Sequence, residues 1–313
     1  MHILLIHQAF ASIQEPGGTR HHELARFLAA RGHQVTIIAS PVSYLTGQTG
    51  LPNRQQWINR QQDGPNITIL RTYTYPALHR SFFHRILSFL SFMLSSFWAA
   101  LRVKDVDLVW GTTPPIFQGG TAWAVARLKR VPFLLEVRDL WPAFAIAVGV
   151  LKNPVLIWAS ERYERFLYRH ADRVMVNSPG YIQHVLDRGA RQVELIPNGA
   201  DPGMFDPTCD GKAFRAQHGL SDDFVVLYAG AHGMSNDLGV VLQAAQMLGD
   251  NPKIKIVLLG DGKEKANLVR QAETLGCTNV LFLPPLSKEH MPDALAASNA
   301  CIAILKDIPL YAT

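Results

Sequence analysis

The sequence predicts an α/β protein made of two Rossmann-like domains, residues 1–205 and 206–313. A length of 313 residues is too great for one ordinary domain and suits two. With 48% hydrophobic and 18% charged residues, the chain can bury a large core. Short apolar runs alternate with helix-like patterns in two successive series, and this order builds parallel sheets covered by helices.

The first series opens with a βαβ unit. Residues 3–7 are an apolar run that predicts a strand, and a glycine-containing loop at residues 17–19 follows. Apolar residues at helical spacing in 24–28 predict a helix, and the β-branched run 34–39 predicts a second strand. Units of this kind form parallel sheets whose sites lie at the carboxyl ends of the strands.

Further strands of the first domain are predicted where β-branched apolar runs recur, at residues 67–71, 108–110, 133–138, 173–177 and 193–196. One helix between them has clear start signals, because Asn153 can cap it and Pro154 suits its first position. Asp105 and Asp107 precede a strand, at the edge of the sheet opposite the expected site. We therefore interpret them as charges on a solvated turn and not as a metal site.

The second series predicts strands at residues 224–229, 255–259, 280–283 and 301–305, separated by helices at 238–248, 264–275 and 288–297. Pro, Asp and Gly cluster in residues 205–211, where we place the domain boundary. Four strands are few for a doubly wound sheet. We therefore expect the second domain to be incomplete and the chain to be truncated at Thr313.

The segment 79–104 interrupts the alternation of strands and helices. Residues 86–101 carry no charge, and as a helix they would span about 24 Å, less than the roughly 30 Å hydrocarbon core of a bilayer. One polar stripe on that helix would hold Arg80, His84, Ser88, Ser91, Ser95 and Arg102. The pattern is compatible with burial in the first domain or with a position on a membrane surface, and the stripe disfavours a membrane-spanning helix.

Charge and cysteine content exclude several classes of function. The net charge of +5 is dispersed and no RNA-binding motif is present, so we expect no nucleic-acid partner. Cys209, Cys277 and Cys301 are far apart, which indicates reduced, partly buried thiols and neither a disulfide framework nor a zinc site. The amino terminus lacks the pattern of a signal peptide, and this predicts a cytoplasmic protein.

Two glycine-rich loops are candidates for binding phosphate groups. One contains Gly17 and Gly18, and the other spans residues 230–239 after the first strand of the second domain. Each precedes a helix, where free amides and the helix dipole can bind a diphosphate. Either loop alone could be a flexible turn, but one in each domain favours a ligand.

Charged side chains also end a strand of the first sheet. Arg138 could bind a phosphate group and Asp139 could orient it or accept a proton, or the two could form a pair that holds a loop. Asn198 and the glycine after it are a turn signal. On the helix after the first glycine loop, we expect one of His21 and His22 to face the site and the other to face solvent.

Taken in order, these segments resemble the family 4 glycosyltransferases of the GT-B fold, and within them a WbuB-like bacterial subgroup that builds O-antigen, capsule and exopolysaccharide. The segments that carry the resemblance are residues 17–25, 31–35, 137–142, 176–178, 196–201, 228–230, 259–262 and 282–285. The resemblance implies a retaining, metal-independent transfer of a sugar from a nucleotide-diphosphate sugar, with no other cofactor. The implied acceptor is a polyprenyl-diphosphate-linked glycan.

The resemblance also implies roles for residues of both domains. Arg138 and Asp139 take the catalytic position. The implied donor-binding residues are Gly17, Gly18, Thr19, Gly230, His232, Gly233, Asn236 and Gly262, and those of the acceptor side of the cleft are His22, Trp141, Asn198 and Asp201. The segment 79–104 would hold the enzyme peripherally on the inner face of the plasma membrane.

Three departures from the family pattern stand out. Arg138 replaces the His that many relatives have at the end of this strand, although the WbuB-like subgroup shares the Arg. The loop after Gly230 lacks the Arg and Lys that neutralise the diphosphate in many relatives. The family's pair of acidic residues that bind the ribose and the sugar is expected after Tyr311.

Two other functions stay compatible with the sequence. A non-catalytic acceptor-binding or scaffold protein would use the first domain and the 79–104 segment alone. A sugar-nucleotide epimerase can have the same fold, but it would need acidic and His groups placed for proton abstraction, and no convincing set is present.

Overall fold

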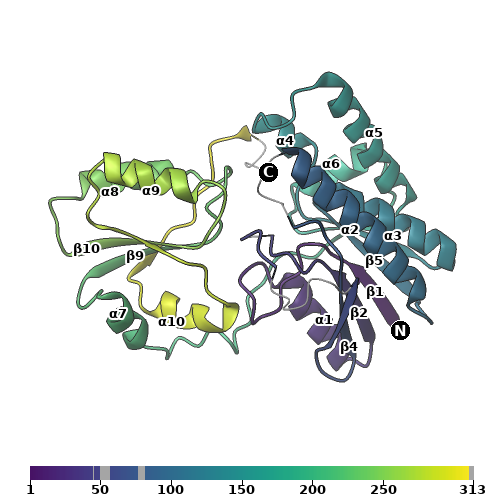
Figure 1. The fold of residues 1–313 in the computed structure, drawn as a ribbon, viewed down its shortest axis with the longest axis horizontal. Coiled ribbons are helices and arrows are strands. Elements are labelled where there is room, and N and C mark those ends of the chain that lie inside the picture. Colours follow the sequence, from purple (N-terminus) through teal and green to yellow (C-terminus); the bar gives the residue numbers. More distant parts are fainter. Residues whose placement is uncertain (45, 50–56, 77–81, 310–313) are drawn as a thin grey trace. The chain divides into compact units, whose positions relative to one another are not determined.

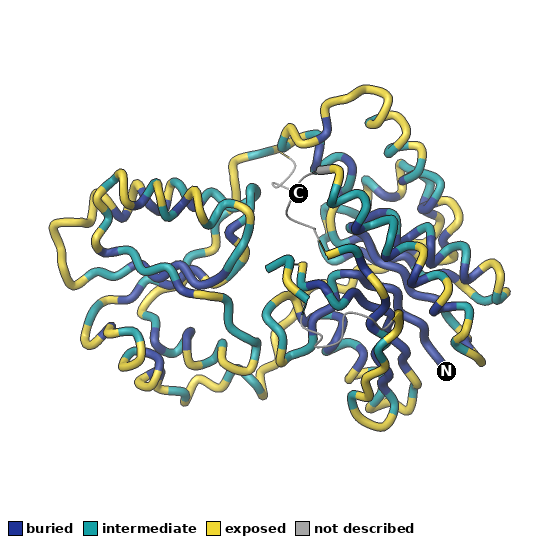
Figure 2. The backbone as a smooth tube through the Cα atoms, viewed as in Figure 1, coloured by how far each residue is buried: buried dark blue, intermediate teal, exposed yellow. Residues whose placement is uncertain are grey.

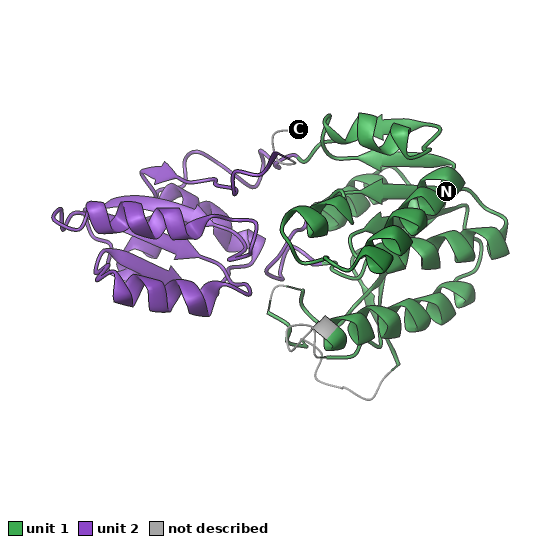
Figure 3. Ribbon diagram, turned by 90° about the horizontal axis from the view of Figure 1, so that it is seen from above, with its two compact units in different colours: residues 1–10, 20–198, 312–313 green, residues 11–19, 199–311 purple. Residues whose placement is uncertain are grey.

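The structure is a computed structural model that describes residues 1–44, 46–49, 57–76 and 82–309. It divides into two compact units (Figure 3). Among the described residues, unit 1 comprises 1–10 and 20–198, and unit 2 comprises 11–19 and 199–309. The division thus lies at 198/199, where the sequence suggested 205/206, and it also groups the loop after the first strand with unit 2.

Unit 1 contains one eight-stranded sheet with the order β3-β4-β2-β1-β5-β6-β7-β8 (Figure 1). Every neighbouring pair is parallel except β3 with β4. The strands are β1 (His2–Ile6), β2 (Gln34–Ala39), β3 (Ile58–Gln62), β4 (Ile67–Thr72), β5 (Leu108–Thr113), β6 (Phe133–Val137), β7 (Arg173–Val176) and β8 (Val193–Leu195). Seven of them confirm predicted strands, and β3 was missed because its sequence is polar and largely exposed.

The helices of unit 1 are α1 (Arg20–Ala30), α2 (Phe82–Arg102), α3 (Ile116–Lys129), α4 (Ala143–Ala147), α5 (Pro154–His170) and α6 (Tyr181–Asp187). The chain leaves β1 in one direction through α1 and leaves β5 in the other through α3. Right-handed crossovers therefore put α1 on one face of the sheet and α2, α3 and α5 on the other. The predicted start of α5 is confirmed, since the Asn153 side chain accepts hydrogen bonds from the amides of Val155 (2.9 Å) and Leu156 (3.2 Å).

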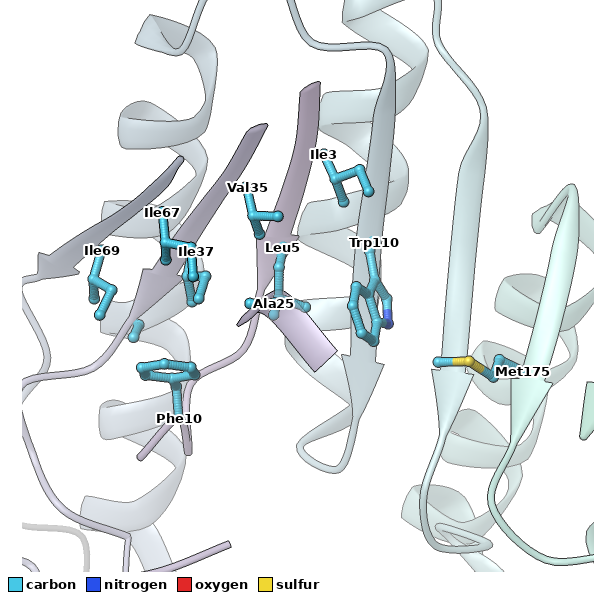
Figure 4. Packing of buried hydrophobic residues seen from close by; sticks show 11 residues of the cluster. Ile3, Leu5, Phe10, Ala25, Val35, Ile37, Ile67, Ile69, Trp110 and Met175 are labelled. Carbon is cyan, nitrogen blue, oxygen red and sulfur yellow. The ribbon is translucent and has the colours of Figure 1, made fainter. Parts of the chain in front are cut away.

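The core beneath α1 shows why the central strands form. Ile3 and Leu5 of β1, Val35 and Ile37 of β2, and Trp110 of β5 pack together (Figure 4). Their neighbours along each strand are also buried, because helices cover both faces of the sheet. Buried residues accordingly concentrate in the strands and on the helix sides turned toward them (Figure 2).

Helix α2 confirms the helix predicted within 79–104, but its orientation differs from the usual amphipathic arrangement. Serines of the polar stripe face inward, with Ser88 and Ser95 buried. The Ser95 hydroxyl donates to the Tyr73 carbonyl at 2.6 Å, and the Ser91 hydroxyl accepts from the Tyr75 amide at 2.8 Å. Arg80 and the start of the predicted segment lie outside the described residues.

The opposite side of α2 carries large apolar groups. The exposed fractions of Phe83, Leu94 and Trp98 are 65%, 59% and 58%. Their separations of 11 and 15 residues are close to whole numbers of turns, so the three share one side of the helix. Residues Phe83–Arg102 are long and apolar enough to cross a membrane. The core helix of a soluble protein can have the same length and hydropathy. One third of an 18-residue apolar stretch within this segment is buried inside unit 1, and α2 packs against α3.

Unit 2 contains a parallel sheet of four strands in the order β11-β10-β9-β12. They are β9 (Phe224–Ala229), β10 (Ile254–Leu259), β11 (Val280–Leu283) and β12 (Ala300–Cys301). The helical elements of unit 2 are α7 (Lys212–His218), α8 (Leu238–Met247), α9 (Lys265–Thr274), the 3-10 turn η1 (Lys288–His290) and α10 (Met291–Ala296). The sheet separates two cores, one against α7 and α10 and the other against α8 and α9.

Two predictions for the end of unit 2 were wrong. The strand predicted at 301–305 ends at Cys301, because after the bond from the Ile302 amide to the Leu227 carbonyl (2.8 Å) the chain turns to the loop after β9. There the Lys306 amide donates to the Ser235 carbonyl at 2.9 Å. Cys301 is consequently exposed rather than partly buried, while Cys209 and Cys277 are half-buried free thiols.

Gly111→Ala tests the contact between β5 and α3. A Cβ at this position would lie 2.5 Å from the Cβ of Ala122 and 3.2 Å from the Phe133 ring, so helix and sheet must separate. We expect unit 1 to lose about 1–3 kcal/mol of stability, measured by urea unfolding. Ala122→Gly in the same chain removes the nearest clash, so the double variant should recover part of the loss. Wild-type stability of Gly111→Ala would contradict this packing.

Candidate functional site

Parallel sheets of this type bind ligands at the carboxyl ends of the strands, where the strand order reverses. In unit 1 the order runs from β1 through β2 to β4 on one side and from β5 to β8 on the other, so the reversal lies between β1 and β5. In unit 2 it lies between β9 and β12.

The centre of the unit 1 edge is a buried carboxylate. Glu136 interrupts the apolar strand β6 and is completely buried. Its Oε2 lies 2.6 Å from Nε2 of His21, and its Oε1 accepts from Nε of Arg20 at 2.9 Å. Both partners come from the first turn of α1, so one acidic residue ties the helix start to the sheet.

The protonation states follow from this pairing. Burial raises the pKa of Glu136, but the His21 ring and the Arg20 guanidinium outweigh it and lower that pKa to about 2. Burial lowers the pKa of His21, opposed by Glu136, and burial also puts the pKa of His7 well below its usual value. At neutral pH the site therefore holds an ionised carboxylate beside two neutral imidazoles.

A second polar chain starts at His7, directly after β1. Its ring lies 4.0 Å from the His21 ring, and its Nδ1 lies 2.8 Å from the Thr112 hydroxyl. That hydroxyl accepts from the Gln118 side chain at 2.8 Å, and the Gln118 oxygen accepts from the Gln8 amide at 2.6 Å. The Thr112 proton is then free to point at Nδ1, which assigns the His7 proton to Nε2.

Arg138 lies beside this chain, and its guanidinium donates to the Pro114 carbonyl at 3.1 Å. Within the described residues Arg138 and Asp139 form no ion pair, so the alternative of an Arg–Asp pair that holds the loop is not what the structure has. Burial lowers the pKa of Arg138, opposed by Glu136 and Asp139, and burial raises the pKa of Asp139, opposed by Arg138. Nε of Arg138 and Nε2 of His7 are buried without a hydrogen-bond partner in the part of the chain that the structure describes.

The first glycine loop leads into α1. Gly17 has φ +144°, in the region that favours glycine, and a Cβ there would lie 3.1 Å from that of Ala11. A Cβ at Gly18 would meet nothing within 4 Å. Thr19 is buried at the helix start. The open side of this predicted donor loop is therefore at Gly18.

The histidines that follow depart from expectation, since neither faces solvent. His21 and His22 are 1% and 2% exposed. His22 pairs with Asp63, outside the Glu136 cluster, and packs edge-on to Phe10. The polar partners of both rings explain their burial.

The other residues predicted for the acceptor side are spread over two elements. Trp141 is half-buried after β6, with its amide bonded to the Asp139 carbonyl at 2.9 Å. Asn198 and Asp201 are exposed, and the Asp201 carboxylate accepts from the Gly203 amide at 2.9 Å. The local turn therefore lies at residues 202–204, whereas Asn198 and Gly199, where the sequence signals a turn, have none.

In unit 2 two loops at the carboxyl edge are packed together. A Cβ on Gly260 would lie 1.9 Å from the Gly230 carbonyl oxygen, and one on Gly262 would lie 2.5 Å from the His232 carbonyl oxygen. The Gly230 amide donates to the Leu259 carbonyl at 3.0 Å. Glycine is required at 260 and 262 for close approach of backbone, which holds the predicted donor loop in place.

The side chains of that loop point in different directions. The His232 ring is completely buried near Tyr228 and Phe282, and burial, with Lys265 nearby, lowers its pKa to about 4. A buried ring does not reach the loop surface, so only the backbone of His232 could make the donor contact that the sequence predicts for this residue. The Asn236 side chain donates to the Ile304 carbonyl at 3.4 Å, and its amide donates to the Gly233 carbonyl at 3.2 Å.

A cavity of about 360 Å³ lies elsewhere in unit 1. It is lined by Arg127, Arg169, Arg191 and residues that directly precede β7 and β8, at the amino edge of the sheet. Within the described ranges no group of three His, Cys, Asp or Glu side chains is placed to hold a metal ion. The site is thus defined by strand ends and buried charges and not by this cavity.

Sequence reasoning missed His7, Glu136 and Gln118 as members of the site. Glu136 had a usable signal, because a single acid within an otherwise apolar strand must find a partner. Gln118 had none, because a glutamine within an apolar helix gives no sign that its side chain joins two strand ends.

Comparison with known proteins gives consistent matches. A family model described as Glycosyl transferase 4-like domain matches residues 17–199, and one described as Glycosyl transferases group 1 matches residues 210–306. WcaI of Escherichia coli (strain K12), which is named as a colanic acid biosynthesis glycosyl transferase, is 28% identical over 294 residues. That alignment covers 91% of this chain and 72% of the relative.

Solved structures share the fold of this chain. Sucrose-phosphate synthase (tll1590) from Thermosynechococcus elongatus has a TM-score of 0.72 at 19% identity, covering 96% of this chain and 74% of its own. Anabaena Alr3699/HepE in complex with UDP and glucose has a TM-score of 0.65 at 17% identity, and the match covers 96% of this chain and 73% of HepE. WaaG, a glycosyltransferase involved in lipopolysaccharide biosynthesis, has a TM-score of 0.63 at 15% identity, and the match covers 96% of this chain and 75% of WaaG. These matches confirm the predicted GT-B fold.

Glu136→Gln tests the buried carboxylate. Because the folded pKa of about 2 lies below the usual 4.5, the ionised group stabilises the fold above pH 4.5, and this contribution is lost as the pH falls toward 2. We expect Glu136→Gln to cost about 3 kcal/mol at pH 7, as for a broken buried ion pair, with a smaller difference from wild type at pH 3.5.

Urea unfolding at both pH values measures this difference. Glu194→Gln is the control, because its pair with Arg173 is half exposed and should contribute under about 1 kcal/mol. A Glu136 effect as small as that of Glu194, or one that grows in acid, would contradict the assignment.

Proposed function

The chain belongs to the glycosyltransferases of the 4-like and group 1 families, and we propose that it moves a sugar from a nucleotide-diphosphate sugar to a lipid-linked glycan. The proposed transfer retains the configuration at the anomeric carbon and needs no metal ion or further cofactor, as the family resemblance implies. A polyprenyl diphosphate is the proposed lipid, and cell-surface polysaccharide is the proposed product, in line with the name of WcaI.

The observation that carries the donor proposal is the pair of glycine loops that follow β1 and β9, the strands beside each reversal of strand order. The open side of Gly18 lets a diphosphate approach the backbone just before α1, where amides and the helix dipole favour an anion. The nucleotide is supported by HepE, whose structures hold UDP and UDP-glucose.

The diphosphate also needs positive charge. The Lys265 ammonium is committed to carbonyls, donating to Gly260 at 2.7 Å and Leu283 at 3.0 Å. Lys263 is exposed beside Gly262, with its Nζ 3.6 Å from the Met234 sulfur. We assign charge neutralisation in unit 2 to Lys263, in place of the Arg and Lys that the loop after Gly230 lacks.

In unit 1 the proposal gives the reacting position to Arg138 and Asp139, with His7 behind them. Nε of Arg138 and Nε2 of His7 are donors without acceptors among the described residues, a feature of sites that bind oxygen-rich ligands. Asp139 lies at the same edge, and its raised pKa suits a group that exchanges a proton with an acceptor hydroxyl.

A lipid-linked acceptor would be met at a membrane surface, and α2 has the features for that. Its outward side carries Phe83, Leu94 and Trp98, while the Ser95 hydroxyl donates to the Tyr73 carbonyl inside the unit. Arg102 and Lys104 are exposed at its carboxyl end, which matches an anionic inner leaflet. Helix α5, which packs on α3 as α2 does, adds exposed Trp158. We therefore place the protein peripherally on the inner face of the plasma membrane.

Gly18→Val tests the donor loop. The position is open, so the fold should tolerate the side chain, but a diphosphate could no longer approach the backbone. We expect UDP-glucose affinity by calorimetry to fall at least tenfold with unchanged thermal unfolding. Thr274→Val, at the exposed end of α9 and outside both glycine loops, is the matched control. Equal affinity in both variants would leave the loop a simple turn, and if no sugar nucleotide binds the wild type, the non-catalytic alternative is favoured.

Membrane docking is tested by flotation with vesicles of phosphatidylglycerol and phosphatidylcholine. Replacement of Phe83, Leu94 and Trp98 by Ser should reduce binding more than tenfold, because each side chain contributes about 1.5 kcal/mol or more when buried. Met247→Ser, which alters an 85% exposed residue of unit 2, should have no effect. Binding that survives the triple change would remove α2 as the docking helix.

A further inference from the structure

The chain passes between the two units at residues 10/11, 19/20 and 198/199 within its described part. Arg20 is the first residue of unit 1 after the second of these crossings, and it begins α1. Residues Ile196 and Pro197 lie just before the third. The sequence separates these two crossings by almost the whole of unit 1.

One side chain joins them. Nη1 of Arg20 donates to the Pro197 carbonyl at 2.8 Å, and Nη2 donates to the Ile196 carbonyl at 2.6 Å. Nε of the same guanidinium donates to Glu136 at 2.9 Å. The planar fork of arginine can serve three acceptors at once in this way, and a lysine ammonium cannot reproduce its geometry.

The anchor point itself is rigid. Glu136 belongs to β6, hydrogen-bonded between β5 and β7, and its second oxygen is held by His21. The Arg20 side chain is only 15% exposed. The carbonyls of Ile196 and Pro197 are therefore joined to the centre of the sheet by two charge-assisted hydrogen bonds from a side chain that Glu136 holds in place.

The linker has few other attachments at this point. The Ile196 amide donates to the Val176 carbonyl at 2.9 Å, and Pro197 has no amide hydrogen to donate. Residues 194–203 are exposed. Beyond Pro197 the next hydrogen bonds of the linker, from Gly203 and Met204 to Asp201, lie within unit 2.

We propose that Arg20 is a positioning residue that sets the pivot between the two units. It clamps residues 196–197 to β6, so rotation is confined to the backbone from Asn198 onward, with Gly199 as the first residue able to turn freely. Because Arg20 also ends the 11–19 segment, both crossings are held at one point of the sheet. The inference rests on the division into units and on these contacts, not on the proposed reaction.

A purely structural role of Arg20 predicts a different effect of the Arg20→Lys substitution. If Arg20 only neutralised the buried Glu136, a lysine would serve almost as well, and the motion of the linker would stay unchanged. If it sets the pivot, Arg20→Lys keeps the charge but releases the two linker carbonyls. Arg20→Lys and Arg20→Gln therefore separate the two roles.

The experiment measures motion between the units directly. Spin labels are placed at Arg127→Cys in unit 1 and Asp250→Cys in unit 2, both exposed, after Cys209, Cys277 and Cys301 are replaced by Ser. Electron–electron distance distributions are recorded for wild type, Arg20→Lys, Arg20→Gln and the control Arg31→Gln. Arg31 lies just after α1, over the Phe27 ring, and contacts no linker residue.

We expect the distance distribution to broaden in Arg20→Lys and Arg20→Gln and to keep its width in Arg31→Gln. Hydrogen exchange at the Ile196 amide, which donates to the Val176 carbonyl, should be roughly tenfold faster in both Arg20 variants, with β1 and β6 unaffected. An unchanged width and unchanged linker exchange in folded Arg20→Lys would overturn the proposal. Neither readout needs a sugar donor, so failure here is distinct from failure of the proposed function.

Discussion

The structure of unit 1 depends on how a single buried carboxylate is satisfied. Glu136 lies in the middle of the sheet, where an unpaired ionised group would be prohibitively costly, and its two oxygens are taken by Arg20 and His21. Both partners come from the first turn of α1, so the pairing fixes where that helix begins. The same Arg20 side chain also donates to the carbonyls of Ile196 and Pro197 after β8.

This arrangement fixes side chains at the carboxyl edge, where parallel sheets of this type bind ligands. His7 and Thr112 come from the two strands beside the reversal of strand order, and Gln118 connects their ends. Unit 2 reaches a comparable rigidity by other means. Backbone from β9 and β10 meets so closely at Gly260 and Gly262 that no other residue fits. One edge is held by charge and hydrogen bonds, the other by steric exclusion.

Helix α2 shows a different use of polarity. In a soluble core helix the apolar side is expected to be turned inward, yet here Ser88 and Ser95 are inside and Trp98 is outside. Burial of Ser95 is compensated, since its hydroxyl donates to the carbonyl of Tyr73 near the end of β4. The apolar side is thereby available for a partner that is itself apolar, and the basic residues at the carboxyl end of the helix favour an anionic surface.

Much of the fold could be predicted from the sequence, because strands buried on both faces and helices with defined starts leave local patterns. The βαβ order, the start of α5 at Asn153 and Pro154, and the glycine loops are of this kind. The polar strand β3 and the short β12 were not predictable, since their limits depend on neighbouring chain. The partners of Glu136 and the inward direction of the α2 serines were decided only by the tertiary structure. A sequence shows that a buried charge needs a partner or that a helix has a polar stripe, but which groups meet depends on residues distant in sequence that the sheet brings together.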